Sequence, residues 1–138
     1  MSKVIVYNSE YLDINYIPEE LLIICTWKPD MITLSVEEFK QEILNFLTPL
    51  EKYKVKRYII NSIDASYPLT ETLRNWIFNN IFSVVEKYGV EKLAIVYPID
   101  YPTRLGLETD FPGIVHKFTS LKISGWDDME SARKWLME

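Results

Sequence analysis

The chain has 138 residues, of which 48% are hydrophobic and 14% aromatic, so it can bury a core of its own as one domain spanning residues 1–138. Its formal net charge of −5 argues against nucleic acid as a partner, because proteins that bind nucleic acid usually present a basic face. We see no signal-like start and no apolar run near the roughly 20 residues of a membrane span. We therefore expect a cytoplasmic protein without stable membrane insertion.

Three strands are predicted before the first helix. Residues 3–8 form a short apolar run, and residues 11–17 alternate between apolar and polar side chains, as in a strand with one wet face. Residues 21–27 are apolar on both sides and should lie deeper in the sheet. We expect the second and third segments to pair as an antiparallel hairpin. Cys25, the single cysteine, lies in this apolar run and is interpreted as a buried structural thiol.

Two long helices follow. Ser35 and Glu38 have the spacing of a capping box, and apolar residues then recur at helical intervals, which predicts a helix over residues 36–52. Residues 58–61 read as a short buried strand. Thr70 is a predicted N-cap for a helix over residues 71–88, which Gly89 ends with a left-handed residue.

The second of these helices, at 71–88, has two apolar stripes. A helix that packs on a sheet needs only one. The first stripe consists of Leu73, Trp76, Ile77, Val84 and Tyr88; the second consists of Phe78, Phe82 and Val85. The surplus either packs beneath a neighbouring helix or forms an interface with another subunit. Phe78 and Phe82 are therefore candidate interface residues of a homodimer.

The second half of the chain alternates strand and helix. Residues 92–97 and 121–126 are predicted strands, separated by a mostly irregular stretch at 98–110 and a short helix near 111–118. Asp127 or Asp128 should cap a closing helix. Helical crossovers imply parallel strands. We predict an α/β fold: a single-layer mixed sheet of about five strands, an antiparallel hairpin followed by parallel strands, backed by about four helices.

The order of three segments suggests a family. These are the basic start and buried strand at 56–61, the run at 91–96 after Gly89, and the aromatic and acidic ending at 126–136. Together they resemble the SpoIIAA-like branch of the STAS superfamily, whose members are often described as STAS/SEC14-like. The resemblance implies a non-catalytic regulatory module that binds another protein. Its SEC14 side implies an alternative, a domain that binds a small apolar or lipid-like ligand in a pocket lined by residues such as Phe78, Phe82, Phe111 and Phe118.

The resemblance also implies a phosphorylated hydroxyl between the predicted strand at 58–61 and the second long helix, at 71–88. The loop there runs from Asp64 to Thr70, and two alignments place the hydroxyl at Ser66 or at Thr70, with Tyr67 between them. From the residues alone, hydroxyls before a helix N-terminus favour an anion. The alternative is ordinary capping by Thr70 and a turn at Ser66.

A second candidate region follows the strand at 92–97. Asp100, Tyr101 and Arg104 lie beyond its carboxyl end, where open α/β sheets place ligands. Arg104 is the expected anion contact there, and Tyr67 and Tyr101 would frame a shared cleft if the two strands are neighbours. The alternative is a solvated connection with a surface ion pair.

The sequence offers no assembled catalytic group. His116 is the single histidine, no Gly-rich phosphate loop occurs, and His and Cys alone cannot complete a zinc site. We therefore predict a protein that is not an enzyme and has no cofactor or metal. A less favoured hypothesis is a metal-dependent hydrolase that uses Asp64 or Asp100.

Overall fold

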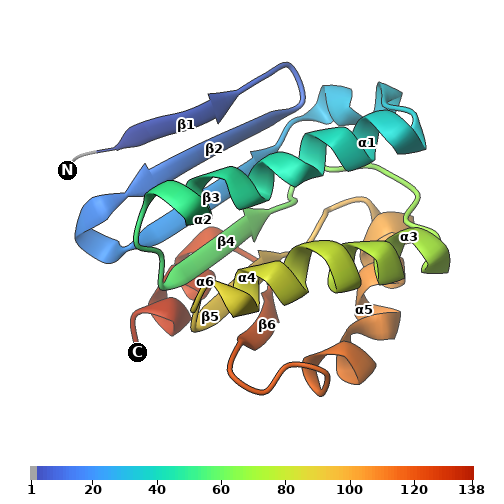
Figure 1. The fold of residues 1–138 in the computed structure, drawn as a ribbon. Helices are drawn as coiled ribbons and strands as arrows, with labels where there is room; N and C mark the ends of the chain where they lie inside the picture. Colours follow the sequence, from blue (N-terminus) through green and yellow to red (C-terminus); the bar gives the residue numbers. More distant parts are fainter. Residues whose placement is uncertain (1–2) are drawn as a thin grey trace.

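A six-stranded mixed sheet runs through the computed structural model, which describes residues 3–138 apart from the side chains of residues 110–112 and 114. Neighbouring strands follow the order of the chain: β1 (Val4–Asn8), β2 (Leu12–Ile17), β3 (Leu22–Trp27), β4 (Arg57–Asn61), β5 (Lys92–Val96) and β6 (Lys122–Trp126). The pairs β1–β2 and β2–β3 are antiparallel, and β3 to β6 run parallel to one another. Figure 1 shows the chain crossing the sheet from one edge to the other.

The predicted mixed sheet with an antiparallel hairpin is confirmed, but the expected count of about five strands is wrong. The hairpin pairs β2 with β3, with Ile14 opposite Cys25. Strand β1 pairs with β2 from Val4 to Asn8 and adds a sixth, edge strand, with a bulge between Ile5 and Tyr7. A bulge leaves one residue unpaired, but the backbone hydrogen bonds between the two strands continue on both sides of it.

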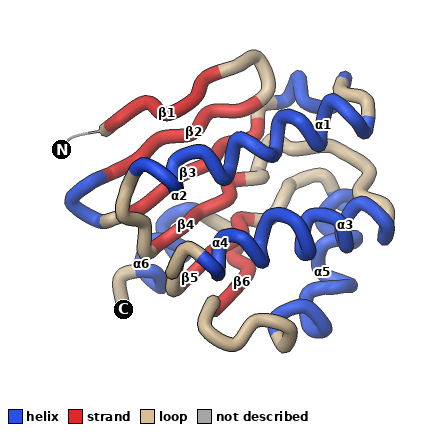
Figure 2. The backbone as a smooth tube through the Cα atoms, viewed as in Figure 1, coloured by secondary structure: helices blue, strands red, loops and turns tan. Residues whose placement is uncertain are grey.

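Helices cover both faces of the sheet unequally (Figure 2). The helical segments of residues 3–138 are α1 (Val36–Ile43), α2 (Thr48–Lys52), α3 (Glu71–Ile77), α4 (Ser83–Lys87), α5 (Tyr101–Val115) and α6 (Met129–Leu136). Helices α1 to α4 pack with Tyr58 and Ile60 in the larger core cluster, which α5 also borders. Helix α6 packs on the opposite face, where Ala132 and Leu136 meet Ile59. The main interior therefore lies between β3–β5 and the helices that precede β6.

The predicted helix at 36–52 exists, with one change of pitch. The side chain of Ser35 accepts from the Glu38 N–H, and the Glu38 carboxylate accepts from the Ser35 N–H, so the capping box is confirmed. A 3-10 segment, Leu44–Leu47, then separates α1 from α2. Pro49 explains this interruption, because a proline has no N–H for the i→i−4 hydrogen bond and its ring crowds the preceding turn.

A π-helical segment explains the two apolar stripes of the helix at 71–88. Phe78–Phe82 lies between α3 and α4, and the Ser83 N–H donates to the Phe78 carbonyl, five residues back. The extra residue in this turn rotates the following side chains by roughly one position around the helix axis. The second stripe, Phe78, Phe82 and Val85, thereby lies on one buried face with Leu73, Ile77 and Ile81. The rest of the first stripe lies outside this face: Trp76 and Val84 are partly buried, and Tyr88 is 46% exposed. Phe78 and Phe82 are buried and offer no exposed surface to a second subunit.

Helix α5 begins earlier than the sequence suggested. The expected loop at 98–110 is helical from Tyr101, because Asp100 caps the segment by accepting from the Thr103 N–H at 3.1 Å. Pro102 lies in the first turn, where the N–H that proline lacks would be unpaired in any helix. Pro102 is thus compatible with the start of α5.

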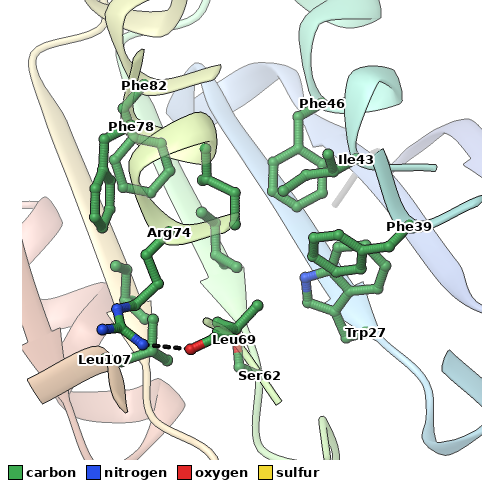
Figure 3. A pocket seen from close by; sticks show the side chains of 13 residues that line it. Trp27, Phe39, Ile43, Phe46, Ser62, Leu69, Arg74, Phe78, Phe82 and Leu107 are labelled. Atoms are coloured by element: carbon green, nitrogen blue, oxygen red, sulfur yellow. Dashed lines mark hydrogen bonds between the residues drawn. The ribbon is translucent and has the colours of Figure 1, made fainter. Parts of the chain in front are cut away.

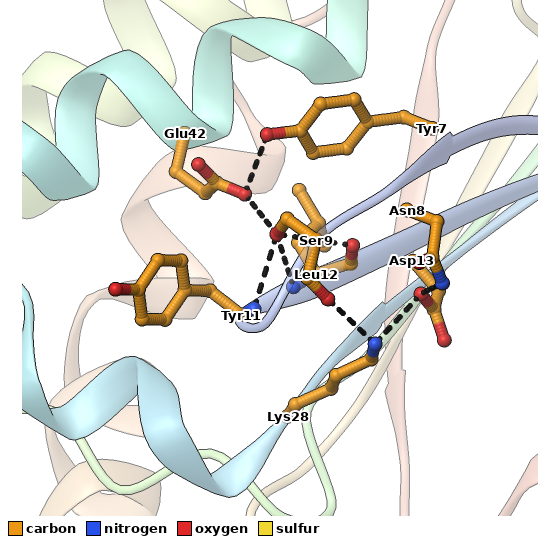
Figure 4. Close-up of polar contacts among 8 residues, drawn as sticks. All are labelled: Tyr7, Asn8, Ser9, Tyr11, Leu12, Asp13, Lys28 and Glu42. Atoms are coloured by element: carbon orange, nitrogen blue, oxygen red, sulfur yellow. Dashed lines mark hydrogen bonds and ion pairs between the residues drawn. The ribbon is translucent and has the colours of Figure 1, made fainter.

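A polar cluster ties the first hairpin turn to α1, as Figure 4 shows. The Glu42 carboxylate accepts from the Tyr7 hydroxyl at 2.9 Å and from the Ser9 hydroxyl at 2.5 Å. Lys28 donates to the Ser9 carbonyl at 2.6 Å and pairs with Asp13 at 3.0 Å. These contacts hold the edge strands against the helix layer.

The buried hydroxyl of Tyr58 joins three elements of the core. It donates to the Phe46 carbonyl at 2.7 Å and accepts from the Cys25 thiol at 3.2 Å. Burial raises the pKa of both the Cys25 thiol and the Tyr58 hydroxyl, so both keep their protons at neutral pH. Cys25 is therefore a structural thiol, as predicted.

Replacing Tyr58→Phe should lower the free energy of unfolding by about 1–3 kcal/mol, because the buried Phe46 carbonyl loses its donor. Urea denaturation followed by circular dichroism measures the change. The control Tyr88→Phe removes a hydroxyl from a side chain that is 46% exposed and should change stability by less than about 0.5 kcal/mol. Equal effects of the two changes would contradict the role given to Tyr58.

Candidate functional site

The two predicted candidate loops meet beyond the carboxyl ends of β4 and β5. The Tyr67 N–H donates to the Thr103 hydroxyl oxygen at 3.1 Å, and that hydroxyl donates to the Asp100 carboxylate at 2.6 Å. Thr103 is buried and thereby bridges a residue of each candidate loop. Parallel neighbours β4 and β5 end at the same edge of the sheet, which is why these loops lie together.

Asp100 is the centre of this loop contact. Hydrogen bonds from the Thr103 hydroxyl, the Thr103 N–H and the Ser66 hydroxyl hold the pKa of the Asp100 carboxyl below its ordinary value. Ser66 is partly buried beside it, whereas Asp64 is exposed. The direct contact between the two loops is the Thr103 bridge from Asp100 to Tyr67, and Ser66 lies near enough to Asp100 to contribute to the lowered pKa.

Arg104 is already neutralised within the chain. Its guanidinium pairs with Glu108 at 2.7 Å and with Asp127 at 2.7 Å, and it lies 4.8 Å from the ring centre of Tyr97. Hydrogen bonds to the two carboxylates, Glu108 first, raise the pKa of Arg104 further. This geometry fits the surface ion pair that was the alternative to an anion contact. Asp128, rather than Asp127, caps α6 by accepting from the Ser131 N–H at 2.7 Å.

The other candidate residues of the two loops differ in burial. Tyr67 is buried, its hydroxyl donates to the Leu34 carbonyl at 2.7 Å, and its ring stacks on Phe39 at 4.8 Å. Tyr101 is 69% exposed. The two tyrosines therefore do not frame a common cleft. Thr70 is the N-cap of α3 and accepts from the Leu73 N–H at 3.2 Å, as the capping interpretation predicts.

An apolar cavity lies between α1 and the α3–π segment, above β3, β4 and β5 (Figure 3). It has a volume of about 60 Å³, and a second cavity of about 40 Å³ adjoins it toward the Tyr67 loop. The two share five lining residues, Trp27, Phe39, Ser62, Leu69 and Leu107, so we treat them as one partly open site, the aromatic cavity. The remaining walls of the larger part are Ile43, Phe46, Ile60, Arg74, Ile77, Phe78, Phe82 and Ile95.

The predicted apolar lining is thus only partly correct. Phe78 and Phe82 line the cavity, and their rings lie 5.3 Å apart. Phe118 instead packs behind Phe82, with ring centres 6.5 Å apart. The side chain of Phe111 lies outside the described residues. The other rings come from Trp27, Phe39 and Phe46, which sequence periodicity assigned only to the core.

Ser62 is the residue that the sequence analysis missed. It follows the predicted strand at 58–61, yet it is 6% exposed and lines both parts of the cavity. The signal was available: side chains two apart on a strand share a face, so extending β4 by one residue puts Ser62 beside Tyr58 and Ile60. Its N–H donates to the Val96 carbonyl at 3.0 Å, which continues the β4–β5 ladder past Asn61.

Within the part of the chain that the structure describes, no three His, Cys, Asp or Glu side chains gather in an arrangement that could hold a metal ion. None of the helices in that part combines the length and apolar character needed to cross a bilayer.

Comparisons with known proteins returned no match: no protein-family model fits the chain, and neither curated proteins nor solved structures are similar to it. Conclusions about function are therefore drawn from the geometry of the cavity and the loops.

The lowered pKa of Asp100 predicts a specific pH dependence. Because the folded-state pKa lies below the ordinary value of about 3.9, the stability that Asp100 contributes is complete above that value and is lost as pH falls through the lowered pKa. Asp100→Asn should therefore show a smaller loss of stability between about pH 5 and about pH 2 than the unmodified protein.

Urea denaturation at a series of pH values measures this difference. Thr103→Val, which keeps the carboxyl group but removes one of its donors, should reduce the pH dependence in the same direction. Identical pH profiles for all three proteins would show that the loop contact does not stabilise the ionised carboxylate.

Proposed function

We propose that this protein is a non-catalytic binding module for a small, largely apolar molecule, which it holds in the aromatic cavity. The observation that carries this proposal is a partly open apolar cavity lined by four phenylalanines and a tryptophan, with a buried serine in its wall. Sites for small molecules are typically apolar enclosures with a few placed polar groups.

Protein interiors are close-packed and usually contain few voids larger than a water molecule. The space of about 60 Å³ among phenylalanine and isoleucine side chains therefore offers a ligand apolar surface to contact through dispersion forces. This supports a binding role for the space.

The size of the cavity narrows the ligand. An engineered cavity of ~150 Å³ holds benzene, whereas the two parts here have about 60 and 40 Å³. A long acyl chain does not fit this space. The proposal therefore concerns a compact apolar molecule and leaves out the lipid-like ligand that the SEC14 side of the resemblance implied.

Xenon tests the cavity directly, because it binds apolar cavities through dispersion forces alone. Addition of xenon should shift the methyl resonances of Ile43, Ile60, Ile77 and Ile95, all of which line the cavity. In Leu107→Phe, a larger side chain enters the space and should abolish the shifts. The matched control Leu105→Phe changes a residue of the same helix that is 48% exposed and should leave them intact.

Two results would overturn the proposal. One is an unmodified protein whose methyl resonances do not respond to xenon. The other is a response of equal size in Leu107→Phe, provided that its circular dichroism spectrum matches that of the unmodified chain.

A second candidate function is the regulatory, protein-binding role of the SpoIIAA-like kind. The specific observation in its favour is the position of Ser66, which lies near the Asp100 carboxylate in a loop beside apolar side chains exposed to solvent. Ile99 is 79% exposed and Tyr101 69% exposed, and exposed apolar groups of this kind serve as docking surfaces for other proteins. A phosphate on Ser66 would place negative charge near the Asp100 carboxylate, and the repulsion between the two groups would separate the loops.

This second function predicts that Ser66, or Thr70 in the other alignment, accepts a phosphate in an extract of the host cell supplied with ATP. Mass spectrometry of the recovered protein locates the modification, and Ser66→Ala and Thr70→Ala distinguish the two sites. Modification of Ser66 should shift the backbone amide resonances of Thr103 and Asp100, since it adds negative charge near the Asp100 carboxylate. A protein recovered without phosphate would count against the regulatory role and leave the cavity proposal untouched.

A further inference from the structure

The sixth strand lies at one edge of the sheet. Strand β6 (Lys122–Trp126) pairs with β5 on one side, and within residues 3–138 no strand pairs with its outer side (Figure 1). The ladder between β5 and β6 is parallel and regular, and each residue of β6 has a partner in it. An edge of this kind presents backbone N–H and C=O groups with which another strand can pair.

The hydrogen bonds to β5 show which backbone groups of β6 face outward. The Lys122 N–H donates to the Glu91 carbonyl at 2.9 Å, and the Trp126 carbonyl accepts from the N–H that follows β5, also at 2.9 Å. The backbone groups of successive residues in a strand point alternately to its two sides. The N–H and C=O groups of Ile123 and Gly125 therefore point away from β5.

These outward groups are arranged symmetrically about Ser124. When a second copy of the chain approaches with its β6 antiparallel, Ser124 of each copy lies opposite Ser124 of the other. Ile123 then lies opposite Gly125, and each such pair exchanges both of its backbone hydrogen bonds. The outer side of β6 is thus complementary to itself, as the interface of a two-fold symmetric dimer must be.

Small residues at the centre of the edge let two backbones approach. Ser124 is partly exposed, and Gly125 has no side chain. The ring of Tyr97 occupies the place that a Cβ of Gly125 would take, on the face of the sheet rather than at its edge. A glycine inside a strand often marks a position where another backbone comes close.

Charge favours the antiparallel orientation. Lys122 is exposed at the start of β6, and Asp127 directly follows its end, with 73% of its side chain exposed. In the antiparallel arrangement the start of each β6 lies beside the end of the other, so Lys122 of one copy comes near Asp127 of the other. Opposite charges across a strand pair attract, whereas a parallel arrangement would place like charges side by side.

We propose that two copies of this chain form a symmetric dimer through β6, in which the strands pair antiparallel about Ser124 and the two sheets become one continuous sheet. This interface differs from the one predicted at Phe78 and Phe82, which are buried. The inference goes beyond the proposed function, since it does not depend on the cavity.

A disulfide between the two copies tests the register. Opposed residues that share no hydrogen bond across an antiparallel pair have Cα atoms ~4.5 Å apart, within the ~4.4–6.8 Å that a disulfide spans. Ser124→Cys should therefore give a covalent dimer on a non-reducing gel after treatment with oxidised glutathione. Thr26→Cys is the matched control: Thr26 is also partly buried and lies on the same face of the sheet, but its strand β3 has a neighbour on each side. This control should stay monomeric, and Cys25 is buried in both proteins.

Sedimentation velocity measures the dimer without cross-linking. The unmodified protein should associate as its concentration rises. Ser124→Lys brings two ammonium groups together at the two-fold axis and should remain monomeric. Lys122→Glu places a carboxylate near Asp127 of the other copy and should raise the dissociation constant of the dimer about fivefold or more. Circular dichroism spectra that match the unmodified protein show that each variant is folded.

The proposed dimer would be excluded by any of these results. One is an unmodified protein that sediments as a monomer at every concentration. Another is a dimer that persists in Ser124→Lys, because its interface would then lie elsewhere. The last is equal cross-linking of Ser124→Cys and Thr26→Cys. None of them bears on the xenon test of the cavity, so the two proposals stand or fall separately.

Discussion

The alternation of side chains along β4 is the constraint on which the rest of the structure depends. Tyr58, Ile60 and Ser62 point toward the larger helix layer, and Ile59 points toward α6. Because β4 has parallel neighbours on both sides, a shift of one residue would exchange these two sets. The Tyr58 hydroxyl bond to Phe46 couples that register to the helical segment above it. The same register brings Ser62 into the cavity wall.

The π segment acts on the same interior from the helix side. It turns Phe78 and Phe82 onto the buried face, where they form one wall of the cavity opposite Phe39 and Phe46 of the first helical unit. A regular α-helix over these residues would send one of the two stripes toward solvent. The cavity thus results from two local features, a strand that continues by one residue and a helix that contains one extra residue.

Much of this fold was predictable from the sequence, for definite physical reasons. The capping box at Ser35, the Thr70 N-cap and the left-handed Gly89 have strong local signals, and the structure contains all three. The hairpin followed from the period of two. The start of α5 was missed because Pro102 reads as a helix breaker unless the helix begins beside it. The π turn could not be foreseen, because the periodicity of side chains was counted on a regular helix. The cavity depends on residues from β3, β4 and both long helices, and no local pattern encodes such a volume.

The bulge in β1 has a consequence for how copies of this chain behave together. Strand β1 is the outer member of the sheet, and its neighbour on the free side is solvent. An uninterrupted row of backbone groups on such an edge can recruit a strand from another molecule. The irregularity between Ile5 and Tyr7 breaks that row near its middle, so the exposed Ile5 does not lie on a regular template. The bulge thereby makes the β1 edge of the sheet a poorer template for pairing with another molecule.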